Sequence, residues 1–319
     1  MTVFFRVAAG PRCGFGHLVR CRSLALALSV APRVSLRATP ATRAIAASFG
    51  WTVIDVESDR ELRRENPALL VVDDPSRAAT RQWVERARRV GMPVATIHDL
   101  GRGYEPSDLI VDGSIRPGTR RGSTPALLGP DFAILHPSFA TVRKSVQPDP
   151  RRVLIALGGG VHVRRVAWRL CREIALRAPG ADIRVARGFV SNRREPALPA
   201  GRWVSAPDGL AAELSQAAVA VVAGGVTLYE ACALGVPVVG LAVTAAQRVP
   251  VRSMARQRAV IEGASIVQTA IAVARLLSDE RLRQKHSKSA RALVDGHGAF
   301  RVAERLRSLM LRKRGIRAA

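Results

Sequence analysis

Lysine and aromatic residues are scarce in this chain of 319 residues. Only 4 of its 50 cationic residues are lysine, and the arginines are spread along most of the sequence. The 4% of aromatic residues do not interleave with these cations, and no nucleic-acid-binding motif is present. Despite a formal charge of +25, we therefore expect no nucleic acid as the main ligand. The charge is compatible with an anionic small molecule or an anionic membrane surface.

Cysteines and long apolar runs are also few. The four cysteines lack C-x-x-C spacing, so we expect reduced, mostly buried thiols and no metal. No apolar run approaches the roughly 20 residues of a membrane span. Met1 leads directly into an expected strand, without the pattern of a signal peptide. These absences predict a cytoplasmic protein.

Short apolar segments alternate with helical patterns, which predicts parallel strands joined by crossover helices. The length favours two domains of roughly 150 residues each. The Pro-rich segment 147–150 is the predicted boundary, so the expected domains are 1–147 and 151–298. The expected strands are 2–8, 34–38, 52–56, 69–73, 94–98 and 109–112 in the first domain, and 152–157, 183–186, 219–223 and 236–241 in the second.

A basic helix or tail is expected over residues 299–319, where apolar residues alternate with many cations. We expect it to pack back on the N-terminal domain. Attachment to an anionic membrane through this basic amphipathic segment is the alternative.

Residues 14–21 read GFGHLVRC and place a histidine where a glycine-rich turn after a strand opens into an expected helix, 17–29. Helix N-termini favour phosphate groups, and His17 can take a proton near neutral pH. A second glycine turn, 158–160, follows the first strand of the second domain and precedes an expected helix, 163–177. Neither turn has the full G-x-G-x-x-G spacing, since Val19 replaces the third glycine of the first. A nicotinamide dinucleotide enzyme is therefore disfavoured.

Residues 223–237, AGGVTLYEACALGVP, read as the end of a strand, a glycine turn, a helix, a glycine C-cap and the next strand. Thr227 and Glu230 have the spacing of a capping box, which would explain both residues. A carboxylate here could also accept hydrogen bonds from both hydroxyls of a ribose. In open α/β sheets, ligands bind beyond the carboxyl ends of the strands, so both glycine turns are expected to face a cleft.

Charged residues follow two strands of the first domain. One of Asp73 and Asp74 is expected to face the crevice, to bind substrate or orient another group, with loop capping as the alternative. Arg20 lies one helical turn after His17 and is a candidate anion partner, or else a solvated arginine. His98 and Asp99 close the next strand and could approach the same crevice.

Several motifs in this order resemble the PseG/SpsG family. They are GFGH followed by Arg20-Cys21, Gly158-Gly159 after a strand, GGVTLYE at 224–230, GVP at 235–237, Gln247, and DGHGA at 295–299. The best-known activity of that family is a UDP-sugar hydrolase of pseudaminic acid biosynthesis. It is built on the GT-B glycosyltransferase fold and is similar to MurG. The resemblance implies two Rossmann-like α/β domains whose parallel sheets face a cleft.

The resemblance implies that His17 is a general base that activates water for attack on the anomeric carbon. The substrate would be a UDP-linked 2,4-diacetamido-2,4,6-trideoxyhexose, and UDP would leave with inversion. Backbone N–H groups would stabilise the leaving group, so no cofactor is expected. Glu230 would hold ribose, and Gln247 would line the sugar or diphosphate side. The expected substrate-binding residues are Gly14, Gly16, Arg20, Asp73, Asp74, Gly158, Gly159, Gly224, Gly225, Val226, Thr227, Glu230 and Gln247.

The chain departs from the family at positions expected to touch substrate. The family's Asp-x-Tyr appears as Asp73-Asp74-Pro75, and its Asn-Gln pair as Ala246-Gln247. The polar residues that follow Gly-Gly in the family are replaced by Gly160-Val161-His162. One alternative is an inverting GT-B glycosyltransferase that uses a UDP-sugar donor and a sugar or lipid-linked acceptor. A second alternative is a non-catalytic nucleotide-binding protein.

Overall fold

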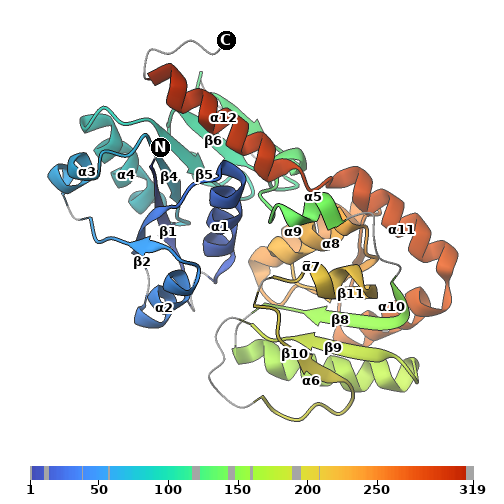
Figure 1. The fold of residues 1–319 in the computed structure, drawn as a ribbon. Helices are drawn as coiled ribbons and strands as arrows, with labels where there is room; N and C mark the ends of the chain where they lie inside the picture. Colours follow the sequence, from blue (N-terminus) through green and yellow to red (C-terminus); the bar gives the residue numbers. More distant parts are fainter. Residues whose placement is uncertain are drawn as a thin grey trace. The chain divides into compact units, whose positions relative to one another are not determined.

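The computed structural model describes residues 2–10, 14–37, 39–56, 58–116, 123–142, 148–158, 161–188, 195–207 and 209–313. It contains two compact units (Figure 1). Unit 1 comprises Met1–Pro137 with His297–Ala319, and unit 2 comprises Ser138–Gly296. The chain enters unit 2 before the boundary predicted at 147–150, because the short helix α5 (Ser138–Thr141) packs against α8 (Val226–Leu234) of that unit.

Unit 1 is built on a seven-stranded parallel sheet with the order β3-β2-β1-β4-β5-β6-β7. The central strand β1 therefore has β2 on one side and β4 on the other, which is the point where the strand order reverses. The strands are β1 (Val3–Ala8), β2 (Arg33–Arg37), β3 (Thr52–Val53), β4 (Leu69–Asp73), β5 (Val94–Ile97), β6 (Leu109–Asp112) and β7 (Ala126–Leu128).

Helices cover both faces of this sheet, so its central strands are mostly apolar. Phe5 packs in a core with side chains of α1 and α12. Its neighbour Phe4 points to the opposite face and stacks on Trp83 of α4 with ring centroids 6.2 Å apart. The helices of unit 1 are α1 (Gly16–Leu28), α2 (Pro40–Ser48), α3 (Asp59–Glu65), α4 (Arg77–Arg89), the 3-10 helix η1 (Pro130–Phe132) and α12 (Gly298–Lys313).

The C-terminal helix α12 belongs to unit 1, where it lies alongside α1 (Figure 1). Val302, Leu306 and Met310 are buried in the unit 1 core. Arg307 adds a hydrogen bond of 2.8 Å from Nη2 to the carbonyl oxygen of Ala27 in α1. The apolar side of this amphipathic helix is thus used inside the fold, which leaves only its charged side for any membrane contact.

Unit 2 repeats the same topology with a six-stranded parallel sheet in the order β10-β9-β8-β11-β12-β13. Helices α6 and α10 pack on one face of it around a core of mainly Val, Ile, Leu and Ala side chains. The strands are β8 (Asp149–Ala156), β9 (Asp182–Ala186), β10 (Arg202–Val204), β11 (Ala217–Val222), β12 (Val238–Gly240) and β13 (Ile261–Glu262). The helices are α5, α6 (Val161–Arg177), α7 (Ala211–Ser215), α8, α9 (Ala245–Arg256), α10 (Ile266–Ser278) and α11 (Glu280–Leu293).

The predicted architecture of two parallel-sheet α/β domains is confirmed, and the differences are local. β3 has only two of the five residues predicted, and β7, β10 and β13 were not predicted. Those three lie at sheet edges and contain two or three residues each, which is too short for a hydrophobic period to show. Among the described residues, none of the helices is both long and apolar enough to cross a membrane.

Candidate active site

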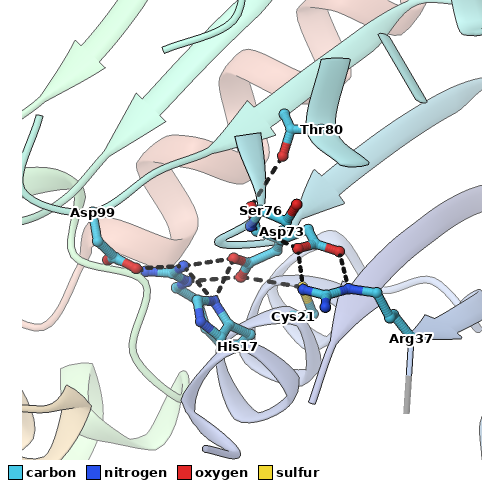
Figure 2. A network of polar contacts seen from close by, with 9 residues as sticks. His17, Cys21, Arg37, Asp73, Ser76, Thr80 and Asp99 are labelled. Carbon is cyan, nitrogen blue, oxygen red and sulfur yellow. Dashed lines mark hydrogen bonds and ion pairs between the residues drawn. The ribbon is translucent and has the colours of Figure 1, made fainter. Parts of the chain in front are cut away.

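His17 and Asp73 meet at the carboxyl edge of the unit 1 sheet. His17 lies in the first turn of α1, which follows β1, and Asp73 is the last residue of the adjacent strand β4. His17 Nδ1 is 2.7 Å from Asp73 Oδ1 (Figure 2). The two side chains expose only 14% and 1% of their surface. Histidine and carboxylate therefore form a largely buried dyad at the crossover point of the sheet.

Arg20 lies one turn further along α1 and binds two carboxylates. Its Nε and Nη2 donate to Asp73 Oδ2 and Oδ1 at 2.9 and 2.6 Å. Its Nη1 and Nη2 donate to Asp99 Oδ1 and Oδ2 at 2.6 and 3.2 Å. One planar guanidinium thus holds two acids, one through each of two edges, in the bidentate geometry that arginine favours.

The charges in this cluster shift one another's pKa. Burial lowers the pKa of His17, but the Asp73 carboxylate raises it more, and the result lies above the usual value. Burial would raise the pKa of Asp73, yet Arg20 and His17 hold it far below its usual range. Asp73 is therefore a carboxylate at all ordinary pH values and accepts hydrogen bonds only.

Asp74 has a different environment from its neighbour. Arg37 Nε and Nη2 donate to Asp74 Oδ2 and Oδ1 at 2.9 and 2.6 Å. The backbone N–H of Ser76 donates to Asp74 Oδ1 at 2.8 Å. Of the two acids at the end of β4, Asp73 contacts the histidine, whereas Asp74 holds the loop that leads to α4.

The glycine turn before α1 is closed by a short backbone bridge. Gly10 and Gly14 exchange hydrogen bonds of 3.1 and 2.7 Å. Gly14 has a φ of +79°, a conformation that favours glycine. Gly16 begins α1, and no acidic residue occupies the first helical turn. Residues 11–13 lie outside the described part of the chain.

His98 lies near the same cluster, at the end of β5. It is buried, with 7% of its surface exposed, and packs edge-on against Tyr104 with ring centroids 5.1 Å apart. Burial lowers its pKa, although Asp112 and Asp73 raise it in part. Its Nε2 has no hydrogen-bond partner among the described residues. His98 is therefore a neutral core histidine beside the dyad.

At the carboxyl edge of the unit 2 sheet, glycines follow the two central strands β8 and β11. Gly224 and Gly225 connect β11 to α8. A Cβ on Gly224 would lie 2.3 Å from the carbonyl oxygen of Gln247, whereas one on Gly225 would meet nothing within 4 Å. Gly158 follows the neighbouring strand β8 with a φ of +96° and equally open surroundings. Gly159 lies outside the described residues.

The predicted capping box of Thr227 and Glu230 is wrong. Helix α8 begins at Val226 with Gly225 as its N-cap, so Thr227 already lies inside the first turn. The Thr227 side chain instead hydrogen-bonds to the Glu230 carboxyl group. Burial raises the pKa of Glu230 to about 7, while the bond from Thr227 lowers it. Glu230 is thus a buried carboxyl group that titrates near neutral pH.

A glutamine does cap a helix nearby. Gln247 Oε1 accepts hydrogen bonds from the backbone N–H groups of Val243 and Thr244 at 2.9 and 3.1 Å. These bonds hold the loop that leads into α9. The amide oxygen of Gln247 therefore has a local role in unit 2, and its backbone carbonyl is the group that forces Gly224 to be a glycine.

The structure groups the predicted residues by unit. His17, Arg20 and Asp73 come together in unit 1, and Gly224, Gly225, Val226, Thr227 and Glu230 lie along one turn and helix start in unit 2. Sequence reasoning weighed Asp99 without linking it to Arg20. The available signal was its place after β5, beside the strand that ends in Asp73. Within the described chain, no three His, Cys, Asp or Glu side chains are grouped so that they could hold a metal ion. Cys21, Cys171 and Cys232 are free thiols and buried.

Comparison with known proteins shows similarity in sequence over most of the chain. No protein-family model matches. The spore coat polysaccharide biosynthesis protein SpsG of Bacillus subtilis (strain 168) is 27% identical over 332 residues, which cover 94% of this chain and 96% of SpsG. The crystal structure of MurG from Acinetobacter baumannii matches with a TM-score of 0.67 and 15% identity, covering 96% of this chain and 99% of MurG.

A third similar protein is the spinosyn rhamnosyltransferase SpnG. Its complex with the spinosyn aglycone gives a TM-score of 0.65 and 18% identity, covering 95% of this chain and all of SpnG. At these identities the two solved structures establish the fold, and SpsG carries the likeness in sequence. The chain is therefore similar in sequence to SpsG over most of its length, and it has the GT-B fold of two parallel-sheet α/β domains.

Proposed function

We propose that this protein is an inverting glycosyltransferase that uses a nucleotide-linked sugar, with UDP as the nucleotide, and His17 as the catalytic base. The observation that carries the proposal is the His17–Asp73 dyad at the carboxyl edge of a Rossmann-like sheet. A carboxylate on Nδ1 keeps a proton there and leaves Nε2 able to accept another. A positioned base of this kind contributes about 10²- to 10⁴-fold to a rate.

The reaction balances without a cofactor. Nε2 of His17 takes the proton of an acceptor hydroxyl while the hydroxyl oxygen bonds to the anomeric carbon of the sugar. The bond from that carbon to the diphosphate oxygen breaks, and the electron pair leaves on the nucleoside diphosphate. Attack from the face opposite the leaving group inverts the anomeric configuration.

Unit 2 supplies the features that suit the nucleotide. The N-terminus of α8 has no acidic residue in its first turn, and Gly225 leaves open space before it. A helix N-terminus with backbone N–H groups stabilises the negative charge of a diphosphate. Glu230 would accept hydrogen bonds from ribose hydroxyls. SpnG, which has a similar fold, has been solved in complex with thymidine diphosphate.

Hydrolysis of the same kind of donor is the second candidate. It is favoured by the motifs shared with the PseG/SpsG family, in which water replaces the acceptor hydroxyl. Against it stand Pro75 and Ala246, which replace the tyrosine and asparagine expected beside the substrate of the hydrolases. Three of the similar solved structures are described as sugar transferases: the spinosyn rhamnosyltransferase SpnG, the spinosyn forosaminyltransferase SpnP and the calicheamicin glycosyltransferase CalG4.

A donor-release assay separates these functions. Purified protein is incubated with UDP-, dTDP-, GDP- and CMP-sugars, with and without a panel of saccharide and lipid-linked acceptors. We expect release of UDP only when an acceptor is present. Release without an acceptor would establish the hydrolase, and no release from any donor would overturn both enzymatic functions.

Binding is measured separately from turnover. A nucleotide at 100 times its dissociation constant should stabilise the fold by about 2.7 kcal/mol in a thermal-shift experiment. We expect UDP to produce this shift in the wild type and in His17→Ala, although that variant should lose turnover. Equal turnover in wild type and His17→Ala would contradict the assignment of the base.

A further inference from the structure

We propose that the exposed side of helices α6 and α10 in unit 2 binds the surface of an anionic lipid bilayer. We call the exposed side chains of these two helices the α6–α10 face. The sequence offered the basic C-terminal segment for such a contact, but the apolar side of α12 is buried in unit 1. The inference goes beyond the proposed function, because it concerns a surface that takes no part in the reaction.

Helices α6 and α10 pack against each other and against the same side of the unit 2 sheet. Val163, Leu170 and Ile174 of α6 point into the core, as do Val273 and Leu276 of α10, and none of them exposes more than 7% of its surface. With 3.6 residues in each turn, the residues on the opposite side of each helix must point away from the sheet. The two adjoining helices therefore share one outer surface.

Large apolar side chains are concentrated on this outer surface. Among the described residues, six large hydrophobic side chains are exposed, and four of them lie on α6 and α10. Trp168 and Leu176 expose 37% and 69% of their surface, and Val267 and Ile271 expose 45% and 52%. Single exposed apolar residues are ordinary, whereas a group of them rimmed by polar residues marks an interaction surface.

The same face is strongly basic. Helices α6 and α10 contain six arginines and a single acid, Glu173. Arg172 Nη2 and Arg177 Nη1 donate to the two carboxylate oxygens of Glu173 at 3.1 and 2.6 Å. Arg165 and Arg169 are exposed, and neither forms an ion pair with any described residue. The one acid of these helices is therefore occupied, and the face has a net positive charge.

This charge argues against a second copy of the chain as the partner. In a dimer with two-fold symmetry the same patch meets itself, so Arg165 and Arg169 would meet arginines with no free acid of α6 or α10 between them. A nucleic acid would neutralise the arginines with its phosphates. It would gain nothing from Leu176, Val267 and Ile271, because its backbone is polar and aliphatic side chains do not stack on bases.

An anionic bilayer uses both properties of the face. Tryptophan and aliphatic side chains enter the boundary between the headgroups and the acyl chains. Arginines remain at the level of the headgroups, where each one near the surface strengthens binding by about fivefold. The Arg172 guanidinium lies over the Trp168 ring, 5.9 Å from its centroid, so the aromatic ring and the charge occupy neighbouring positions.

The experiment is sedimentation of the full chain with lipid vesicles. We expect the protein to sediment with vesicles of phosphatidylcholine and phosphatidylglycerol in equal parts, and to remain in solution with pure phosphatidylcholine. Trp168 is the exposed tryptophan among the four, since Trp51 and Trp83 are buried and Trp203 is half-buried. Its emission should move to shorter wavelength on binding, and Trp168→Phe should bind without that component of the shift.

Two double variants separate the charges from the apolar contacts. Arg165→Gln with Arg169→Gln should weaken vesicle binding by about 25-fold at low ionic strength. Trp168→Ser with Leu176→Ser should weaken it by about tenfold and leave the salt dependence in place. All four side chains are exposed, so the thermal unfolding temperature should stay close to that of the wild type.

Matched controls are available in unit 1. Arg305→Gln with Arg312→Gln removes the same charge from exposed positions of α12, and it also tests the C-terminal segment as the alternative contact. Leu26→Ser removes an apolar side chain of α1 that exposes 47% of its surface. We expect both controls to bind the mixed vesicles within about twofold of the wild type.

The inference would be overturned if the protein did not sediment with the mixed vesicles, or if the α12 control lost as much binding as the Arg165 and Arg169 variant. Full binding by the Trp168 and Leu176 variant would reject insertion of the apolar side chains. A dimer in analytical ultracentrifugation that dissociates in Leu176→Ser would assign the face to a second copy. No sugar donor is used, so these results do not depend on the turnover assay.

Discussion

The two units place very different groups at the same position of the same topology. In both sheets the strand order reverses at a central strand, β1 in unit 1 and β8 in unit 2. At the carboxyl edge of the sheet in unit 1 lie the charged or titratable residues His17, Arg20, Asp73 and Asp99. At the corresponding edge in unit 2 lie Gly158, Gly224 and Gly225.

The difference matches two kinds of chemistry. Proton transfer needs a titratable side chain held in one orientation, which requires buried ionic partners around it. Binding of a diphosphate needs backbone N–H groups that the ligand can approach, which requires the absence of side chains. A single fold can therefore serve both purposes at equivalent edges, and the substitutions below test each edge in turn.

Asp73→Asn should have the largest effect, because it removes the carboxylate on which the dyad and the guanidinium converge. We expect turnover to fall by about 10²- to 10⁴-fold, since an amide no longer fixes the proton on Nδ1. Breaking a buried ion pair by removing one partner should also cost about 3 to 5 kcal/mol of unfolding free energy. Steady-state kinetics and urea unfolding measure the two losses.

The pH dependence of the same variant provides a second check. The pKa of Asp73 is lower in the folded state than in the unfolded state, so its contribution to stability is present above about pH 4 and is lost below it. The unfolding free energy of Asp73→Asn should therefore change less with pH in acid solution than that of the wild type. If the unfolding free energies of Asp73→Asn and wild type depended equally on pH below about pH 4, Asp73 would not be the group that titrates there.

Glu230→Gln tests unit 2 and should stabilise it. The pKa of Glu230 rises from 4.5 to about 7 on folding. The favourable contribution of Glu230 to the free energy of unfolding is therefore complete below pH 4.5 and is lost as the pH increases through 7. At pH 8 we expect the variant to be more stable than wild type by up to about 3 kcal/mol, with no gain near pH 4.

Denaturant midpoints at pH 4.5 and pH 8 measure this effect. Glu262→Gln is the matched control, because Glu262 is an exposed acid in the same unit, bound to Arg252 at 2.9 Å. We expect the control to show no such gain at pH 8. If Glu230 holds ribose, Glu230→Gln should also weaken UDP binding, and an unchanged UDP affinity would reject that role.

The smallest effects should distinguish the two neighbouring glycines. Gly224→Ala would place a methyl group 2.3 Å from the Gln247 carbonyl oxygen and should cost about 1 to 3 kcal/mol. Gly225→Ala meets open space at a φ of −105° and should change stability by less than about 1 kcal/mol. Only Gly225→Ala should weaken UDP binding without loss of stability, as calorimetry and urea unfolding would show.

Much of the fold could be predicted from the sequence, because its signals are local. The apolar strands β1, β4, β6 and β11 fall within one or two residues of the expected bounds, since runs such as VFFRVA are buried on both faces of a parallel sheet. The edge strands β7, β10 and β13 carry no such run and were missed. The capping box of Thr227 was misplaced because Gly225, which has no side chain to signal a cap, occupies the N-cap position.

The site was predictable as a set of candidates but not as an arrangement. The sequence by itself determined that His17 opens a helix after a strand, and that two acids follow a buried strand. Only the tertiary structure decided that Asp73 faces His17 while Asp74 binds Arg37, and that Arg20 joins Asp73 to Asp99. These pairings join residues up to 79 positions apart. Their geometry depends on the order of strands in the sheet, which no local pattern of residues contains.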